Sequence, residues 1–169
     1  GIGPTYTDKI SRNGLRVGDL LHNFDEKYAA AKARHLSMLK ALDGDTDVAE
    51  LEKQWFEAVE YLKEYPIIDS EYDINEYLCQ GKKVLCEGAQ GTMLDVDFGS
   101  YPFVTSSNTV SAGACTGLGV APSRIGDVYG IFKAYCTRVG RGPFPTELFD
   151  ETGRKLRDLG HEYGAVTGR

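Results

Sequence analysis

The sequence lacks the long apolar runs, the excess of basic residues and the leader that mark several large classes of protein. No stretch approaches the roughly 18 consecutive apolar residues of a membrane helix, so no membrane partner is predicted. Lysine and arginine total 19 against 25 aspartates and glutamates, and the net charge of −6 disfavours a nucleic-acid partner. The start, Gly1-Ile2-Gly3-Pro4, has neither the basic nor the apolar part of a secretory leader.

Cysteine and histidine are also scarce. The four cysteines, at positions 79, 86, 115 and 136, fit neither paired zinc ligands nor a dense disulfide framework, which favours a reducing compartment. The three histidines, His22, His35 and His161, share no metal-ligand spacing. We therefore predict no metal site in this chain and structural or surface roles for the histidines.

The sequence does contain enough apolar material for one core, because 41% of its 169 residues are hydrophobic. Only five of the 20 glycines precede residue 81, so the two halves of the chain are expected to be built differently. The first residue is not methionine, and the last residues, Gly164-Ala165-Val166-Thr167-Gly168-Arg169, would suit a ligand loop. We expect a piece of a longer protein, forming a single incomplete domain over residues 1–169.

The first half predicts helices. Apolar residues recur at helical spacing over residues 24–42 and again over residues 48–62, and each run follows a candidate capping residue, Asn23 or Asp47. Because the link between the two runs is short, these helices should pack as an antiparallel hairpin. A third, shorter helix is predicted over residues 70–80.

The second half predicts strands. Residues 83–87 form a short apolar run ended by Gly88, and a second apolar run follows at residues 128–136. The separation between the two runs is typical of the crossover between parallel strands. The sequence therefore predicts an α/β fold, as part of a mainly parallel sheet with flanking helices and a helical-hairpin insertion.

The loop after the first predicted strand, Glu87-Gly88-Ala89-Gln90-Gly91-Thr92, is a candidate floor for a nucleotide. Its glycines would let backbone N–H groups approach a ligand, and Gln90 offers an amide donor and acceptor. The loop does not have the spacing of the Walker-type phosphate loop. A turn without a ligand is the alternative interpretation of the same residues.

Small polar side chains crowd the segment Thr105-Ser106-Ser107-Asn108-Thr109. Each can bond a phosphate oxygen or cap a helix. The alternative to phosphate binding is that Ser107 or Asn108 simply caps a helix over residues 110–117. A helix N-terminus is itself an anion site, so the two interpretations are compatible.

Two groups of charged residues are further candidates. Asp95 and Asp97 favour either a cation-binding or acid–base pair, or two carboxylates on a surface turn. Arg138, Arg141 and Arg169 lie in glycine-bearing segments, where arginine forks suit the carboxylate or phosphate of a small anionic molecule. Ordinary surface arginines are the alternative.

Several ordered blocks of the sequence resemble the adenylosuccinate synthetase family, and the resemblance spans residues 1–169. The blocks are Val84-Leu85-Cys86-Glu87-Gly88-Ala89-Gln90-Gly91-Thr92-Met93-Leu94-Asp95, Tyr101-Pro102-Phe103-Val104-Thr105-Ser106-Ser107-Asn108-Thr109, Thr137-Arg138-Val139-Gly140, Gly142-Pro143-Phe144-Pro145-Thr146-Glu147, and Gly1-Ile2-Gly3-Pro4 with Arg12-Asn13-Gly14-Leu15-Arg16-Val17-Gly18-Asp19. The resemblance implies a cytoplasmic homodimeric ligase of purine biosynthesis. Such an enzyme uses GTP and Mg²⁺ to phosphorylate the 6-oxygen of IMP, and aspartate then displaces the phosphate to give adenylosuccinate.

The resemblance also implies roles for individual residues. Gln90 matches a glutamine near the 6-position of IMP, and Thr105 matches a threonine that holds its 5′-phosphate. Arg12 matches an arginine that reaches across the dimer to the partner's IMP phosphate, and Leu94 and Val139 match residues lining the nucleotide. The positions on the aspartate-binding loop are Ala165, Val166, Thr167, Gly168 and Arg169, and Arg169 also matches a ribose contact of IMP.

Other family segments have no counterpart in these residues. They are an upstream phosphate loop with the catalytic aspartate, an upstream histidine acting as general acid, and a downstream guanine-reading segment. We therefore expect no catalytic residue here, no tight binding of GTP or Mg²⁺, and no activity of the chain alone. Residues 1–20 are expected to form a dimer and IMP-phosphate segment, residues 21–80 a helical insertion, and residues 81–169 the nucleotide-site segment. The alternative is a noncatalytic nucleotide-binding or dimerisation module.

Overall fold

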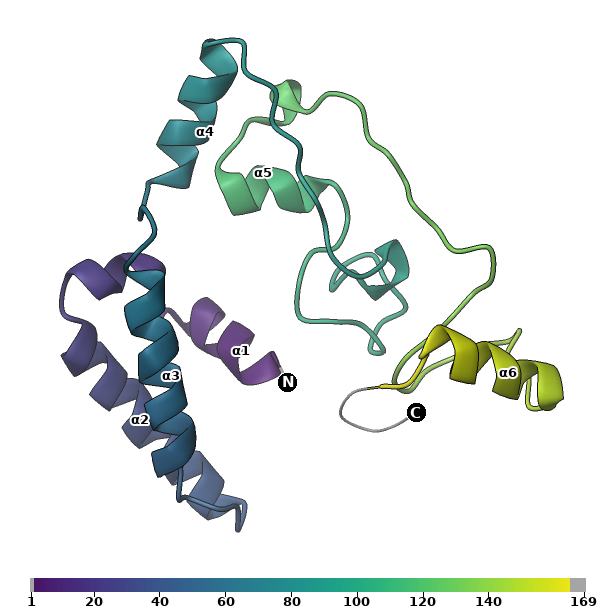
Figure 1. The fold of residues 1–169 in the computed structure, drawn as a ribbon, viewed down its shortest axis with the longest axis horizontal. Helices are drawn as coiled ribbons and strands as arrows, with labels where there is room; N and C mark the ends of the chain where they lie inside the picture. The colour runs from purple at the N-terminus through teal and green to yellow at the C-terminus, as the bar shows by residue number, and fades with distance from the viewer. Residues whose placement is uncertain (1, 165–169) are drawn as a thin grey trace. The chain divides into compact units, whose positions relative to one another are not determined.

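The computed structural model describes residues 2–164, and all regular structure in that range is helical (Figure 1). The described residues form two compact units, residues 4–73 and the remainder, and each has its own packing. The α-helices are α1 (Gly3–Ser11), α2 (Phe24–Ala41), α3 (Ala49–Leu62), α4 (Ser70–Cys79), α5 (Ala112–Leu118) and α6 (Glu151–Gly160). Short 3₁₀ turns lie at Val17–Leu21, Thr92–Leu94 and Pro122–Arg124.

Helices α2 and α3 pack through aromatic side chains within the first unit. The Tyr28 and Trp55 rings stack with their centroids 4.8 Å apart, and Phe56 meets Tyr28 edge-on at 5.0 Å. Phe24 stacks on the other end of the cluster, 5.8 Å from Trp55. Offset stacks and edge-to-face pairs are the arrangements that aromatic rings prefer, so these four side chains form the main contact between the two helices.

The two helices run in opposite directions (Figure 1). Phe24, at the start of α2, contacts Phe56, whereas Lys32, two turns further on, donates to Glu52 at 2.5 Å. Tyr28 also donates to Glu52, at 2.6 Å. The antiparallel pair of helices predicted at residues 24–42 and 48–62 is therefore confirmed.

The capping residues predicted for these helices are only partly confirmed. Asn23 does precede α2, but it has a φ of 57° and its side chain makes no capping hydrogen bond. Asp47 does bond the start of α3, because its Oδ1 accepts from the backbone N–H of Ala49 at 3.2 Å. The formal N-cap of α3 is Val48.

The second unit is built around shorter helices. The helix predicted at residues 70–80 is confirmed as α4, and Asn75 on it donates to the backbone oxygen of Gly119, just after α5, at 3.0 Å. Helix α6 begins at a side-chain cap, since Asp150 accepts from the N–H of Gly153 at 2.9 Å. No helix within residues 2–164 is long and apolar enough to cross a membrane, and the four cysteines are free thiols.

The predicted α/β class is wrong, because residues 2–164 contain no strand and no sheet. The two runs predicted as strands, residues 83–87 and 128–136, have no paired backbone. Most of their apolar side chains are exposed, with Leu85 at 91% and Ile131 at 98%. An apolar run indicates a local preference for extended backbone. A strand also needs a neighbouring segment whose backbone forms hydrogen bonds with it. The described residues provide no such neighbour.

Candidate functional site

The segment of residues 91–110 is organised around one carboxylate. Asp95 is fully buried, with 0% of its surface exposed. Its Oδ1 accepts from the backbone N–H groups of Asp97 at 2.9 Å and Phe98 at 3.1 Å. Its Oδ2 accepts from those of Thr109 at 2.7 Å and Val110 at 3.2 Å. One side chain therefore holds two stretches of the loop together.

The electrostatics of Asp95 follow from this geometry. Burial raises the pKa of the carboxyl, but the four backbone N–H groups stabilise the charged form, and the pKa falls to about 2. Asp95 is therefore an anion at neutral pH. Four N–H groups already surround it, so its surroundings suit this fixed anion and not a bound cation.

Further hydrogen bonds join the two stretches, and one of them links two residues expected to meet IMP. The N–H of Thr105 donates to the oxygen of Leu94 at 2.8 Å, and the N–H of Val96 donates to the oxygen of Ser107 at 3.2 Å. The Thr109 hydroxyl donates to the oxygen of Gly91 at 2.7 Å. Leu94 and Thr105 thus lie next to each other, although ten residues separate them in the sequence.

Gln90 and Arg12 share an unusual backbone conformation. Gln90, which is exposed directly before this loop, has a φ of 68°, and Arg12, at the end of α1, has a φ of 65°. Residues other than glycine rarely adopt this left-handed conformation, and it often occurs at functional positions. Arg12 belongs to the first unit and Gln90 to the second.

Val139, half-exposed, follows an arginine that attaches its segment to the same loop. Arg138 Nη2 donates to the backbone oxygens of Phe103 at 3.0 Å and Arg141 at 2.9 Å. Gly142, with a φ of 121°, lies directly against Phe103 at this contact. A Cβ at position 142 would lie only 2.7 Å from the Cβ of Phe103. The guanidinium of Arg138 therefore bonds protein carbonyls and has a structural role in this loop.

Two other expectations change. Neither Ser107 nor Asn108 caps a helix, because α5 begins after Ser111, with no side-chain capping bond, and Asn108 donates to Asp97 Oδ2 at 2.9 Å. Asp95 is not a surface carboxylate, whereas Asp97 is exposed, so the surface-turn alternative holds for Asp97 alone. In the sequence, Asp95 was notable only because it lies between a glycine loop and a run of polar residues. Asp97 lies there too, so this position could not show which of the two carboxylates is buried.

A further contact joins residues 133–137 to the end of the described chain. Lys133 pairs with Glu162 and donates to the Thr137 hydroxyl at 2.8 Å. Hydrogen bonding from Lys133 is the main cause that lowers the pKa of Glu162. The positions predicted to bind aspartate, Ala165, Val166, Thr167, Gly168 and Arg169, lie outside the described residues.

Comparison with known proteins identifies the family. The family model described as adenylosuccinate synthetase matches residues 1–169. The chain belongs to the adenylosuccinate synthetase family. The resemblance found in the sequence is thereby confirmed.

The relatives show how much of an adenylosuccinate synthetase this chain represents. It is 75% identical to the adenylosuccinate synthetase of Phocaeicola vulgatus and 74% identical to that of Bacteroides thetaiotaomicron, in both cases over the whole chain. It spans 40% of the length of each of these relatives. A solved structure titled as the fully ligated adenylosuccinate synthetase of Plasmodium falciparum matches 99% of the chain, and 39% of its own length, at 40% identity and a TM-score of 0.83.

Proposed function

We propose that this chain supplies part of the IMP site of a GTP-dependent adenylosuccinate synthetase, a cytoplasmic homodimer that ligates IMP and aspartate in purine biosynthesis. The observation that supports the proposal is the 91–110 loop, where a backbone bond joins Thr105 to Leu94, two residues for which the family resemblance implies contact with IMP. Asp95 fixes this loop from within. A rigid support of this kind is what a binding site needs in order to hold its ligand in one geometry.

The side chains of this region fit two different tasks. The Thr105 hydroxyl would donate to the 5′-phosphate of IMP, a group that does not react, and so would bind ground state and transition state equally. The Gln90 amide would donate near the 6-oxygen of the base, where charge develops during the reaction, and so would act mainly in the transition state. Val139 and Leu94 would supply apolar contacts to the nucleotide, and Arg12 would reach the phosphate bound by the partner subunit.

The described residues do not fit a metal. Within residues 2–164 no group of three or more histidine, cysteine, aspartate or glutamate side chains could hold one. We therefore assign no step of the reaction to Mg²⁺ held by these residues. The aspartate-binding role of residues 165–169 rests on the family alone.

The test is a pair of alanine variants in a full-length synthetase that carries this chain. Thr105→Ala should raise the KM for IMP about 10-fold with little change in kcat, since one bond to a charged group is lost. The backbone bond to Leu94 does not depend on the side chain and should remain. Gln90→Ala should lower kcat by about 10- to 100-fold, as expected when a donor to a developing charge is removed. Steady-state kinetics and thermal midpoints are measured together.

Thr116→Ala provides the matched control. Thr116 is exposed on α5, and its hydroxyl reaches only the backbone oxygen of Gly113, at 3.4 Å. We expect wild-type kinetics from this variant. If Gln90→Ala keeps the wild-type kcat, or if both site variants lose activity only in proportion to a lowered midpoint, the proposed roles are wrong.

A further inference from the structure

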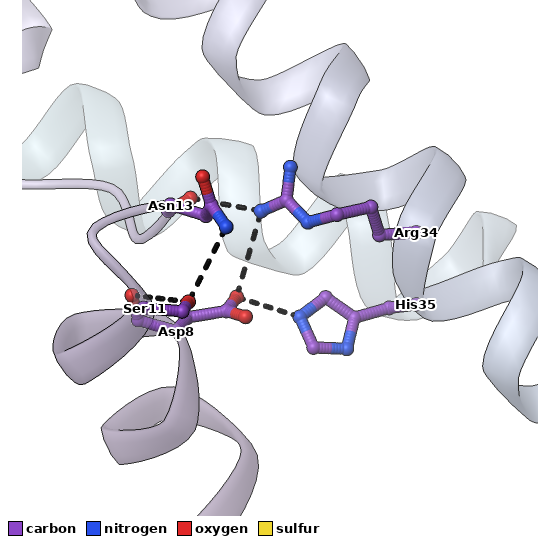
Figure 2. A network of polar contacts seen from close by, with 5 residues as sticks. All are labelled: Asp8, Ser11, Asn13, Arg34 and His35. Carbon is purple, nitrogen blue, oxygen red and sulfur yellow. Dashed lines mark hydrogen bonds and ion pairs between the residues drawn. The ribbon is translucent and has the colours of Figure 1, made fainter.

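The turn that carries Arg12 is held by a network from a second helix (Figure 2). The side chain of Asp8, on α1, accepts from His35 Nε2 at 2.7 Å, and Arg34 Nη2 lies 3.9 Å from the same oxygen. Arg34 Nη2 also donates to the backbone oxygen of Asn13 at 2.8 Å. Two neighbouring residues of α2 therefore clamp both sides of Arg12, at Asp8 before it and at Asn13 after it.

The turn is also closed by bonds of its own. The backbone oxygen of Asp8 accepts from the N–H groups of Asn13 at 3.0 Å and Gly14 at 3.1 Å. The Ser11 hydroxyl donates to the same oxygen at 3.1 Å, and Asn13 Nδ2 donates to Ser11 Oγ at 3.3 Å. These bonds surround Arg12 on both sides in the sequence.

Arg12 itself is exposed and has a φ of 65°. A non-glycine residue keeps this conformation only when its surroundings fix it, because the isolated chain prefers negative φ. The network in Figure 2 provides that fixation. It therefore determines the direction in which the chain presents the Arg12 side chain, while leaving that side chain open to a ligand.

We propose that Arg34 and His35 are positioning residues for IMP binding, which act by holding the turn of Arg12. The inference rests on the proposed function, in which Arg12 binds the phosphate of IMP. When the clamp is removed, only a fraction of molecules present Arg12 correctly, and the apparent affinity for IMP falls by that fraction. The affinity for GTP and the chemical step do not depend on this turn.

The experiment is a double-mutant cycle in a full-length synthetase that carries this chain. Arg12→Ala should raise the KM for IMP about 10- to 150-fold, as expected for loss of a charge-assisted phosphate contact. Arg34→Ala and His35→Ala should each raise it about 3- to 10-fold, with the KM for GTP and kcat changing less than about 2-fold. In the Arg12→Ala background the same two substitutions should have no further effect on the KM for IMP.

Two further variants separate positioning from general stability. His35→Gln keeps an N–H donor opposite Asp8 and should restore a KM for IMP near that of the wild type. Lys32→Ala removes a contact of the same helix with Glu52, away from the turn, and should leave the KM for IMP unchanged. If either α2 variant fails to fold, the other still completes the cycle.

The possible failures are distinguishable. If Arg12→Ala leaves the KM for IMP unchanged, the proposed role of Arg12 is wrong, and the positioning role is wrong with it. If Arg12→Ala raises that KM but Arg34→Ala and His35→Ala do not, only the positioning role is wrong. The positioning role is also wrong if Arg34→Ala and His35→Ala raise the KM for IMP equally in the presence and absence of Arg12. An equal rise in the KM for GTP would contradict it as well.

Discussion

At the scale of single residues, Asp95 is a fully buried carboxylate that holds its loop together. Four backbone N–H groups from two stretches of the loop point at one carboxylate. Asp95→Ala would leave these buried donors without an acceptor. In a full-length synthetase we expect the thermal midpoint to fall by a few degrees and the KM for IMP to rise, because Thr105 is held by the same loop. Calorimetry and steady-state kinetics measure the two effects, and an unchanged midpoint would contradict the role of Asp95.

The charge of Asp95 makes a separate prediction about pH. Its pKa in the folded protein, about 2, lies below its ordinary value of 3.8, so folding favours the charged form. The stability contributed by this charge is therefore fully present above about pH 4 and is lost as the pH falls toward 2. Asp95→Asn removes the charge, so the difference between the wild-type and variant denaturation midpoints should be largest at pH 5 to 7. The difference between the two midpoints should be smaller at pH 3. If the difference is the same at every pH, the charge of Asp95 does not contribute to stability.

The roles that the family resemblance implies for single residues remain predictions, whereas residues placed by tertiary contacts were poorly predicted from the sequence. Polar residues at 105–109 after a glycine loop were enough to indicate a candidate site. Nothing local distinguished Asp95, which is buried, from Asp97, two residues away and exposed. Arg138 was a candidate anion ligand because a guanidinium suits phosphates, and the sequence did not indicate that it also donates to backbone oxygens.

At the scale of elements, the aromatic cluster between α2 and α3 should dominate the stability of the first unit. Trp55→Ala removes ring contacts with Phe24, Tyr28 and Phe56. We expect a loss of about 1.5 to 4.5 kcal/mol in the free energy of unfolding, since three aromatic pairs are lost and each contributes roughly 0.5 to 1.5 kcal/mol. Leu51→Ala is the control on the same helix, because Leu51 is 67% exposed. Chemical denaturation of a full-length synthetase measures both, and equal losses would contradict the role of the cluster.

The helices were predictable because their signals are local. Apolar spacing at 24–42 and 48–62 identifies one face of each helix, whichever partner covers it. Helix α6 was missed, although Asp150 three residues before Gly153 is a capping signal that could have indicated it. The predicted strands failed because pairing is not a local property: residues 128–132 have strand-forming side chains and no paired neighbour among residues 2–164.

At the scale of the whole molecule, the chain exposes more surface than a self-contained protein of its size. A compact protein of 18.6 kDa exposes about 8,200 Å², and two separate compact domains sharing that mass would expose about 10,000 Å². The chain exposes 13,532 Å². Large apolar side chains account for part of the excess, including Ile131 at 98% and Phe132 at 91%. The relatives, of which this chain spans 40%, have further residues available to cover such side chains.

This excess predicts how the 169-residue chain should behave when it is produced alone. Its exposed apolar surface should bind the dye ANS, and it should unfold without one sharp transition, because few apolar side chains are buried. We also expect no adenylosuccinate from IMP, GTP, Mg²⁺ and aspartate above a no-enzyme control, because the family resemblance implies no catalytic residue in this chain. A full-length synthetase carrying the same residues is the positive control for activity and cooperative unfolding. Adenylosuccinate formation by the 169 residues alone would show that they contain a complete active site, whereas a sharp transition without ANS binding would show that they form a sufficient core by themselves.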